Sequence, residues 1–284
     1  MRSNRRLGQH FLNHPAAAGW MVDAAGITPD DLVVEIGPGR GALTDRLLRC
    51  AKQVVGIELD SALADFLRQR FKASPQLKIL NQDVLQVDFS ALMQNWGFEK
   101  AVLVGNLPYQ ITGAVVAQIL DAWAVWKRAV LMVQREVGAR MVAAPGGKDY
   151  GILSIAVQIR THPRRLFDLK PRHFVPPPRV HSSVIQMDFS GDLPVEIAHE
   201  GFFFQVVRTA FQQRRKMLKN TLKGFVGNQM AVLEQVLENA EVHPNVRPEA
   251  VSGAQFEAIS RALMAFSAEE SEPDRSKGER IGTA

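Results

Sequence analysis

Short apolar segments alternate with helical stretches along the first half of the chain, and this alternation restricts the possible folds more than any other feature. The apolar segments lie at residues 32–36, 53–59, 77–80, 101–104 and 129–133. Strands that alternate with helices form βαβ units, whose strands run parallel and are covered on both faces. The sequence therefore predicts an α/β fold with a doubly wound, Rossmann-like sheet.

Two later segments differ from these buried strands. Residues 151–159 (GILSIAVQI) and 180–189 (VHSSVIQMDF) alternate more regularly between apolar and polar side chains. A period of two is typical of strands that face solvent on one side. We expect both segments to form an antiparallel edge of the sheet.

After residue 194 the pattern changes to helices alone. The helical patterns cover residues 202–212, 215–223, 230–239 and 255–266. We therefore expect a sheet domain over residues 1–190 and a small all-helical domain over residues 195–266. Residues 267–284 are polar and nearly devoid of large apolar side chains, which predicts a disordered C-terminal tail.

Composition argues against a membrane protein and against a metal site. The longest apolar runs fall far short of a membrane span, and the N-terminal residues MRSNRRLGQHF lack the apolar core of a signal peptide. We expect a cytoplasmic protein that does not bind a membrane. Cys50 is the only cysteine, so the chain can form neither an intrachain disulfide nor a cluster of thiolate ligands, and we expect no metal.

The distribution of charge favours a polyanionic partner. The chain has 34 Lys and Arg against 29 Asp and Glu, a net charge of +5. Four runs with few acidic residues concentrate the basic side chains, at residues 2–6 (RSNRR), 160–165 (RTHPRR), 170–179 (KPRHFVPPPR) and 212–223 (QQRRKMLKNTLK). One such run is usually a solvated surface, but four of them beside a nucleotide-type domain favour nucleic acid.

A glycine-rich turn, EIGPGRG at residues 35–41, follows the first predicted strand. Doubly wound sheets bind nucleotides at the carboxyl ends of their strands, and Gly37, Gly39 and Gly41 let the backbone approach a ligand. A dinucleotide is one interpretation. However, the spacing differs from G-x-G-x-x-G, and the turn brings Glu35 where a pyrophosphate needs N–H donors. A cationic ligand such as S-adenosylmethionine fits better.

Two further acids follow predicted strands. Glu58 in GIELD ends the second strand about 20 residues beyond the turn, where an acid can accept hydrogen bonds from ribose hydroxyls. Asp83 in NQDVL follows the third strand and could accept from the adenine amino group. Each acid alone could be a helix cap or a surface residue. Together with the glycine turn, they predict an S-adenosylmethionine site.

Seven motifs resemble those of one known family. They are RRLGQHFL (5–12), VEIGPGRGALT (34–44), GIELD (56–60), NQDVL (81–85), GNLPY (105–109), HFVPPPRVHSSV (173–184) and FQQRRKMLKNTL (211–222). In this order, they resemble the bacterial 16S rRNA adenine N6,N6-dimethyltransferases (KsgA/RsmA type) over roughly residues 5–266. The resemblance implies that residues 1–190 form an S-adenosylmethionine-dependent methyltransferase domain and that residues 195–266 bind RNA.

The resemblance also implies a reaction. Methyl groups pass from S-adenosylmethionine to N6 of two adjacent adenosines in the loop of the 3′-terminal hairpin of 16S rRNA. Each adenosine becomes N6,N6-dimethyladenosine during small-subunit biogenesis. The implied partner is 16S rRNA in the small ribosomal subunit or its precursor, and we expect the protein to act as a monomer.

The motif GNLPY then has a chemical interpretation, although alone it could be a strand-ending turn. The N6 lone pair of adenine is delocalised into the ring, so acceptors that hold the N6 hydrogens favour a nitrogen that can attack. We expect the Asn106 oxygen and the Leu107 carbonyl to do this, with Pro108 stiffening the turn. Tyr109 offers a ring on which the flipped base can stack, and the resemblance implies Phe174 as the opposing aromatic.

Further contacts are carried over from the resemblance. The N-terminal segment, residues 1–30, is expected to close over the methionine end of the cofactor through Gln9, His10 and Leu12. Many relatives have Asn in place of His10, but imidazole can still make one hydrogen bond. We expect Gln213–Lys216 at a helix start to bind RNA phosphates. The candidate RNA contacts are Arg172, Arg179, Arg208, Arg214, Arg215, Lys216 and Lys219.

Three other functions remain open on the sequence. A DNA adenine-N6 methyltransferase would share the pocket, although such enzymes usually show Asp-Pro where this chain has Asn106-Leu107. A 23S rRNA adenine-N6 methyltransferase of the resistance type is not fully separated by these motifs. A non-catalytic ribosome-assembly or RNA-binding factor is the third, and the intact set of site residues argues against it.

Overall fold

The structure, a computed structural model, describes residues 9–271, with side chains described up to Ser267. The chain divides into two compact units. The sheet unit contains residues up to Ala143 together with Ala156–Pro194, and the helical unit contains Ala144–Ile155 and the residues from Val195 onward. The expected sheet domain over residues 1–190 thus differs from the sheet unit, because Ala144–Ile155 group with the helices. The basic run at residues 2–6 lies outside the described residues.

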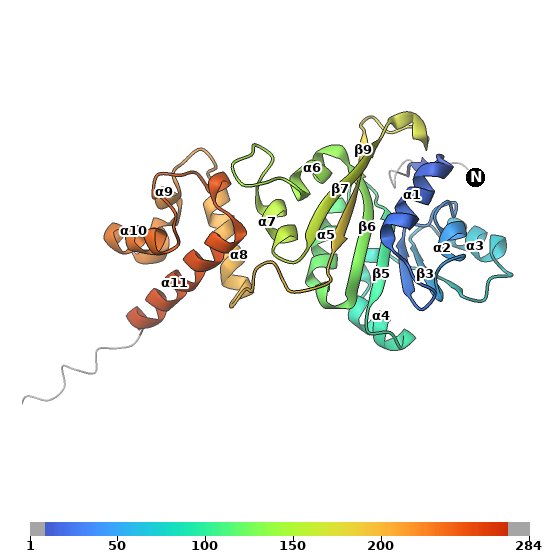
Figure 1. Cartoon of the computed structure of the whole chain (residues 1–284), viewed down its shortest axis with the longest axis horizontal. Helices are drawn as coiled ribbons and strands as arrows, with labels where there is room; N and C mark the ends of the chain where they lie inside the picture. The colour runs from blue at the N-terminus through green and yellow to red at the C-terminus, as the bar shows by residue number, and fades with distance from the viewer. Residues whose placement is uncertain (1–8, 272–284) are drawn as a thin grey trace, which may run out of the picture. The chain divides into compact units, whose positions relative to one another are not determined.

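A seven-stranded sheet, in the order β4-β3-β2-β5-β6-β9-β7, forms the centre of the sheet unit (Figure 1). The strands are β2 (Leu32–Ile36), β3 (Gln53–Glu58), β4 (Leu77–Asn81), β5 (Ala101–Asn106), β6 (Trp126–Gln134), β7 (His162–Leu169) and β9 (Ser182–Asp188). The strands from β4 to β6 in this order are parallel, and β9 is antiparallel to both β6 and β7. The predicted doubly wound α/β fold is confirmed.

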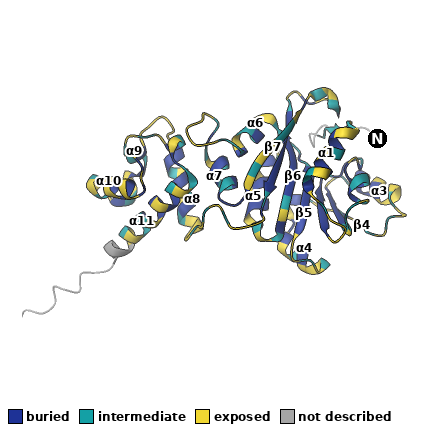
Figure 2. Cartoon of the chain, in the orientation of Figure 1, coloured by how far each residue is buried: buried dark blue, intermediate teal, exposed yellow. Residues whose placement is uncertain are grey.

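The middle of this sheet is buried on both faces. All five residues of β2 are buried, and the strand pairs with β3 on one side and β5 on the other. On one face, Val33, Val102 and Val130 pack against the helix α1 (Pro15–Ala25). Figure 2 shows the central strands as buried and the outer surfaces of the helices as exposed. This two-sided burial is why the strands appear in the sequence as continuous apolar runs.

Helices and 3-10 turns connect the strands. They are α1, α2 (Thr44–Leu47), α3 (Ser61–Arg70), η2 (Val84–Gln86), α4 (Phe89–Trp96), α5 (Thr112–Asp121), η3 (Trp123–Val125), α6 (Arg135–Met141), α7 (Ile152–Gln158) and η4 (Pro171–His173). Aspartate side chains cap two of these helices at their N-termini. Asp60 accepts hydrogen bonds from two backbone amides in the first turn of α3, and Asp88 accepts one from the first turn of α4. Ser61, which follows Asp60, is the first helical residue of α3.

The prediction of a strand at residues 151–159 is wrong. This segment forms the helix α7, in which the Ile155 N–H donates to the Gly151 carbonyl at 3.0 Å. The Gly151 N–H in turn donates to the Ser154 hydroxyl at 3.1 Å, so the Ser154 side chain caps the start of the helix. A short apolar run fits a buried helix as well as a strand, and only these capping contacts distinguish the two.

A strand that the sequence pattern did not reveal takes the edge position. β7 pairs only with β9, and most of its residues are partly or fully exposed. It carries Pro163 and the charged residues Arg164 and Arg165, which strands tolerate at an edge but not in a sheet centre. The other expected edge segment, residues 180–189, is confirmed as an antiparallel strand, β9, but its edge position is wrong, because β9 lies between β6 and β7.

The strand order reverses between β2 and β5. From β2 the chain proceeds outward to β3 and β4, and it then crosses to the other side for β5 and β6. Such a switch point leaves a crevice beyond the carboxyl ends of the two diverging strands. A separate two-stranded sheet joins β1 (Phe11–Leu12) to β8 (Phe174–Val175), with Phe11 opposite Val175.

The helical unit has its own apolar core. Its elements are α8 (Glu200–Phe211), α9 (Leu218–Leu222), η5 (Lys223–Val226), α10 (Met230–Asn239), η6 (Pro248–Ala250) and α11 (Gly253–Ser271). Phe203, Leu233 and Phe256 are fully buried in it. Residues 213–216 form the turn between α8 and α9, so the expectation that they begin a helix is wrong. None of the helices in residues 9–271 has the length and apolar character that crossing a bilayer requires.

The predicted start of the C-terminal tail is also wrong. Residues 267–271 continue α11 as its last turn. The rest of the predicted tail, residues 272–284, lies outside the described residues.

Candidate active site

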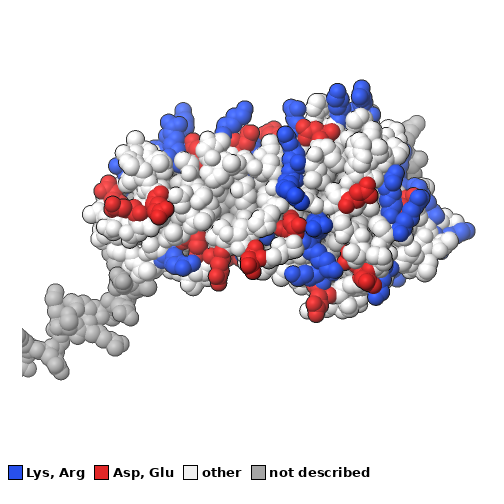
Figure 3. Space-filling view, viewed as in Figure 1, with Lys and Arg blue, Asp and Glu red and all other residues white. Residues whose placement is uncertain are grey.

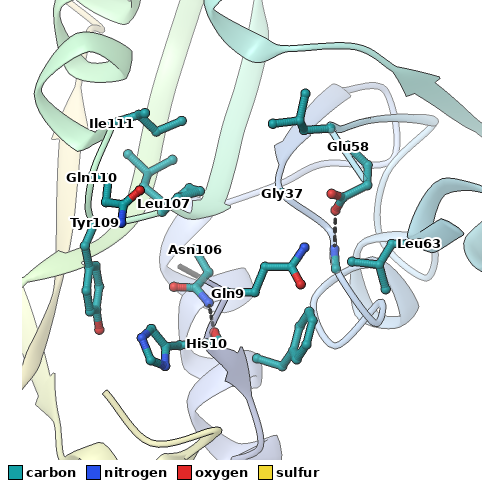
Figure 4. A pocket seen from close by; sticks show the side chains of 14 residues that line it. Gln9, His10, Gly37, Glu58, Leu63, Asn106, Leu107, Tyr109, Gln110 and Ile111 are labelled. Carbon is teal, nitrogen blue, oxygen red and sulfur yellow. Dashed lines mark hydrogen bonds between the residues drawn. The ribbon is translucent and has the colours of Figure 1, made fainter. Parts of the chain in front are cut away.

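A pocket opens at the carboxyl ends of β2, β3 and β5, the switch point of the sheet (Figure 4). The pocket and its mouth contain about 800 Å³ of empty space. Nine of the predicted site residues line it: Gln9, His10, Gly37, Gly39, Glu58, Asn106, Leu107, Pro108 and Tyr109. Segments far apart in the sequence thus meet at one place, as the βαβ pattern predicts.

The glycine turn forms one wall of the pocket. Gly37 and Gly39 have φ angles of 65° and 58°, in the left-handed region that favours glycine. A Cβ atom at Gly39 would lie 3.0 Å from the ring of Phe11, so a side chain there would displace this neighbour. The turn is fixed by the Gly37 N–H, which donates to the Ile57 carbonyl on β3 at 3.0 Å. Glycine is therefore needed both for the backbone shape and for the close approach of Phe11.

Glu58 forms the acidic part of the pocket. One carboxylate oxygen accepts from the Gly39 N–H and the other from the Asp60 N–H, both at 3.0 Å. The side chain is only 5% exposed, and burial raises its pKa although both backbone bonds oppose the shift. These bonds hold the carboxylate in one orientation, and each oxygen keeps a second lone pair. A diol that enters the pocket would meet a fixed acceptor.

Glu35 has a different position from the one expected. Its side chain is 1% exposed, and it accepts from the Thr44 hydroxyl at 2.6 Å. Burial raises the pKa of this carboxyl to about 8, so it is mostly protonated at neutral pH. Glu35 lines a small cavity beneath the glycine turn rather than the main pocket. It braces the turn from within, and its predicted contact with the cofactor stays a prediction.

Replacing Glu35 by glutamine is expected to remove a pH-dependent loss of stability. The folded pKa of about 8 lies above the ordinary value of 4.5, so wild type loses stability as the pH rises through this interval and the proton must leave. Glutamine still accepts from Thr44 and never ionises. Above the interval, the variant should therefore be more stable by several kcal/mol, since one pKa unit corresponds to about 1.4 kcal/mol.

Urea unfolding on either side of this interval measures the effect. All four tryptophans belong to the sheet unit, so fluorescence follows the unit that contains Glu35. A stability difference between variant and wild type that stays constant with pH would show that the carboxyl does not titrate there.

Asn106 is the last residue of β5, and the nitrogen and the oxygen of its side-chain amide have different roles. The Nδ2 group donates to the His10 carbonyl at 2.8 Å, and Figure 4 shows the amide oxygen on the side of Tyr109. The turn that follows is rigid, because the Pro108 carbonyl accepts from both Ile111 N–H (3.2 Å) and Thr112 Oγ1 (3.0 Å). The amide oxygen is thus presented to the pocket as an acceptor.

Tyr109 and His10 form an aromatic pair beside this oxygen. Their ring centroids are 5.6 Å apart and the planes differ by 28°. The Tyr109 hydroxyl shares a hydrogen bond of 2.7 Å with the Ser182 hydroxyl, and burial raises the pKa of the phenol, which stays protonated. His10 Nδ1 donates to the Pro176 carbonyl at 2.7 Å, which requires the proton on Nδ1. Both rings are therefore held in place.

Besides Glu35, four residues predicted to contact the cofactor or the base lie outside the pocket. Phe174 is 2% exposed and belongs to the core cluster with Val184, so in this structure it presents no face to a base. The pairing of β8 with β1 turns Phe174 inward and leaves Val175 exposed. Leu12 and Gly41 line a neighbouring groove, and the Asp83 side chain caps η2 by accepting from the Leu85 N–H at 3.0 Å.

The pocket also contains residues that the sequence did not indicate. They are Phe11, Leu59, Leu63, Gln110 and Ile111. For Leu59 the sequence did offer a signal, because this large apolar residue directly follows the strand-end acid Glu58. Its side chain is 50% exposed. Exposed apolar side chains at a crevice offer a surface for a planar ring. Asp60 was also missed, and its side chain accepts from Gln9 Nε2 at 3.4 Å.

The predicted RNA contacts have several different environments. In the helical unit, Arg214 donates to the Lys148 carbonyl at 3.1 Å and to the Tyr150 carbonyl at 2.9 Å, which ties the α8–α9 turn to the segment Ala144–Ile155. Arg215 and Lys216 are exposed in this turn. The remaining contacts are Lys219 with Glu234 at 3.8 Å, Arg208 over the Phe204 ring at 5.8 Å, and Arg172 Nε with His173 Nε2 at 3.5 Å. Arg179 is exposed.

We expect Arg214→Ala to loosen this segment. The variant loses two charge-assisted hydrogen bonds to backbone carbonyls, so amide exchange at residues 144–151 should accelerate by roughly tenfold. Arg215→Ala is the matched control, since Arg215 lies in the same turn and is exposed. Hydrogen exchange followed by mass spectrometry makes the measurement, and equal exchange in both variants would contradict the assignment.

The chain matches known proteins along most of its length. Residues 1–259 match the family described as ribosomal RNA adenine dimethylase. A ribosomal RNA small subunit methyltransferase A of Desulforapulum autotrophicum is 38% identical over 266 residues, which cover 93% of this chain and 93% of the relative.

Two solved structures share the fold. A dimethyladenosine transferase from Plasmodium falciparum has a TM-score of 0.76 at 23% identity, covering 92% of this chain and 98% of that one. The 23S rRNA methyltransferase ErmE has a TM-score of 0.70 at 24% identity, covering 89% of this chain and 99% of that one. At such identities the likeness concerns the fold, whereas the family match rests on the sequence of this chain. The chain belongs to the ribosomal RNA adenine dimethylase family.

Proposed function

We propose that this chain transfers methyl groups from S-adenosylmethionine to N6 of two adjacent adenosines in the 3′-terminal hairpin loop of 16S rRNA, giving N6,N6-dimethyladenosine. The observation that carries this proposal is the orientation of Asn106. Its amide nitrogen is engaged by the His10 carbonyl, so its oxygen is left beside Tyr109 as a fixed acceptor. An amino group on a planar ring is the substrate that such an arrangement suits.

The pocket residues fit S-adenosylmethionine. Glu58 presents a carboxylate that backbone N–H groups hold in place, which suits two ribose hydroxyls. The exposed Leu59 beside it suits an adenine ring, and the glycine turn lets the backbone approach the methionine portion. When bound, this cofactor supplies a methyl carbon activated by the adjacent sulfonium.

The chain's own residues then orient the adenine nitrogen. Asn106 Oδ1 and the Leu107 carbonyl accept the two N6 hydrogens, which draws the lone pair out of the ring and toward the cofactor side of the pocket. The base stacks on Tyr109, whose ring is fixed through Ser182. The proton that N6 loses can pass to water, since the pocket is open. Most of the acceleration comes from positioning and electrostatics.

The RNA partner is proposed from charge and from the relatives. Arg215 and Lys216 are exposed and project from the α8–α9 turn, where they can contact phosphates. The relative from Desulforapulum autotrophicum is named for the small ribosomal subunit, which favours 16S over 23S rRNA. We further propose a cytoplasmic monomer that acts during small-subunit biogenesis. A purely structural assembly factor is less favoured, because the acceptor set of the pocket is complete.

Methyl transfer to ribosomal particles tests the proposal. Tritiated S-adenosylmethionine is supplied with small subunits that lack the modification, and the modified bases are located by mass spectrometry. We expect four methyl groups per particle, two on each of two adjacent adenosines at the 3′ hairpin. Labelling of large-subunit rRNA instead would support the resistance-type activity, and binding without labelling would support the non-catalytic factor.

A further inference from the structure

A second concave surface lies beside the cofactor pocket in the sheet unit. Three arginines line it, Arg40, Arg46 and Arg70, together with His14 and the ring of Phe11. We call it the arginine groove. Phe11 also lines the cofactor pocket, so the two cavities share one wall. The three arginines lie outside the four basic runs of the sequence and come from separate segments, so only the fold brings them together.

The arginines are held rather than freely solvated. Arg46 on α2 donates to the Pro15 carbonyl at the start of α1 at 3.0 Å. The Arg40 guanidinium lies 4.6 Å from the centre of the Phe11 ring, and Arg70 at the end of α3 donates to the Arg40 carbonyl. A guanidinium has five N–H donors. Because each of these two hydrogen bonds uses a single guanidinium nitrogen, Arg46 and Arg70 can still donate to a ligand.

The charge of the groove is strongly positive. Asp45 is the only acid among its lining residues, and it pairs with Arg49 outside the groove at 2.7 Å. Figure 3 shows Lys and Arg side chains gathered over the region of α1 and α2. Three guanidinium groups that line one groove repel one another, and an anion bound among them would relieve this repulsion. The fork geometry of arginine matches the paired oxygens of a phosphate.

We propose that the arginine groove binds a phosphodiester of the substrate RNA, next to the nucleotide whose base enters the pocket. The proposal rests on the proposed function and adds an RNA contact in the sheet unit that is separate from the α8–α9 turn. A base that leaves its stack must be held through its backbone on both sides. The wall shared through Phe11 places such a hold beside the pocket.

Substitutions that remove charge at the groove test this. Arg46→Gln combined with Arg70→Gln removes two of the three guanidinium groups, and Arg70→Gln alone changes an exposed side chain with little risk to folding. Arg68→Gln is the matched control, since it makes the same charge change on α3, while neither Arg68 nor its partner Asp65 lines the groove. Binding to unmodified small subunits is measured as a function of salt concentration, beside calorimetry with S-adenosylmethionine.

The expected result is a smaller salt dependence. The slope of log K against log salt should fall by about 1.5 in the double variant and by about half of that in Arg70→Gln, since each phosphate contact contributes roughly 0.7 to 0.9. RNA affinity should fall by roughly tenfold or more at moderate salt, while S-adenosylmethionine affinity and the rate at saturating RNA stay at wild-type values.

Two results would overturn the proposal: a wild-type slope in both groove variants, or an equal loss in Arg68→Gln. If the double variant also loses cofactor affinity, its salt slope cannot be assigned to the groove, and the slope of Arg70→Gln alone decides the proposal. The methylation assay with the wild-type protein tests the proposed function independently of these binding measurements. Particles that bind with a groove-dependent slope but gain no methyl group would refute the proposed function and leave the groove as an RNA site.

Discussion

Replacing Asn106 by alanine is expected to slow methyl transfer within the RNA-bound enzyme by roughly a hundred- to a thousandfold, the usual effect of removing one aligned polar group from an active site. The side-chain oxygen acts mainly while N6 changes its hybridisation, so the loss should appear in the single-turnover rate. RNA affinity and cofactor affinity should fall only modestly. Rapid-quench measurements at saturating RNA and cofactor give this rate directly.

Asn106→Asp separates the two tasks of this side chain. It keeps oxygen acceptors in the pocket but loses the N–H group that donates to the His10 carbonyl. If the acceptor matters most, Asn106→Asp should retain more of the single-turnover rate than Asn106→Ala. A collapse of RNA affinity with a normal rate once bound would show instead that Asn106 docks the RNA.

We expect Glu58→Ala to weaken S-adenosylmethionine binding by roughly ten- to a hundredfold, since hydrogen bonds to a charged group contribute about 1.5 to 3 kcal/mol. The loss has two parts. The carboxylate no longer meets the ribose, and the Gly39 and Asp60 N–H groups lose the acceptor that fixes them. Calorimetry measures the affinity, and circular dichroism confirms that the variant is folded.

Asp65→Ala provides the control for Glu58. Asp65 is an exposed acid on α3 that pairs with Arg68, so its loss changes the net charge equally without touching the pocket. The affinity of wild type should also weaken as the pH falls through the raised pKa of Glu58, because protonation removes an acceptor. Unchanged affinity in Glu58→Ala would place the ribose elsewhere.

Burial explains which strands could be predicted from the sequence. β2 has neighbours on both sides and helices on both faces, so each of its residues must be apolar or, like Glu35, satisfied internally. β7 has one neighbour and an exposed edge, so burial does not restrict its composition, and the sequence showed its arginines only as part of a basic run. The prediction of a strand at residues 151–159 was wrong for the opposite reason, because a short apolar run fits a buried helix as well as a buried strand.

The candidate site was predictable in position but not in detail. The topology brings strand ends together, which is enough to expect Glu58 and Asn106 in one crevice. The contacts that orient them join residues distant in sequence, such as Asn106 with His10 and Gly39 with Glu58. No local pattern encodes these pairs. Phe174 shows the same limit, because the register of β8 with β1 decides whether its ring faces the core.

The shortness of β1 bears on the timing of the reaction. The proposed transfer of two methyl groups to each of two adenosines requires repeated exchange of spent cofactor, and Gln9, His10 and Phe11 form one wall of the pocket that it must leave. Among the described residues, three contacts hold this wall by its backbone: the two-residue pairing with β8, the Asn13 N–H bond to the His173 carbonyl at 2.8 Å, and the Asn106 Nδ2 bond to the His10 carbonyl at 2.8 Å. So small a ladder opens at little cost in free energy. We therefore expect the opening of this N-terminal wall, more than the methyl-transfer step, to limit the rate of successive rounds.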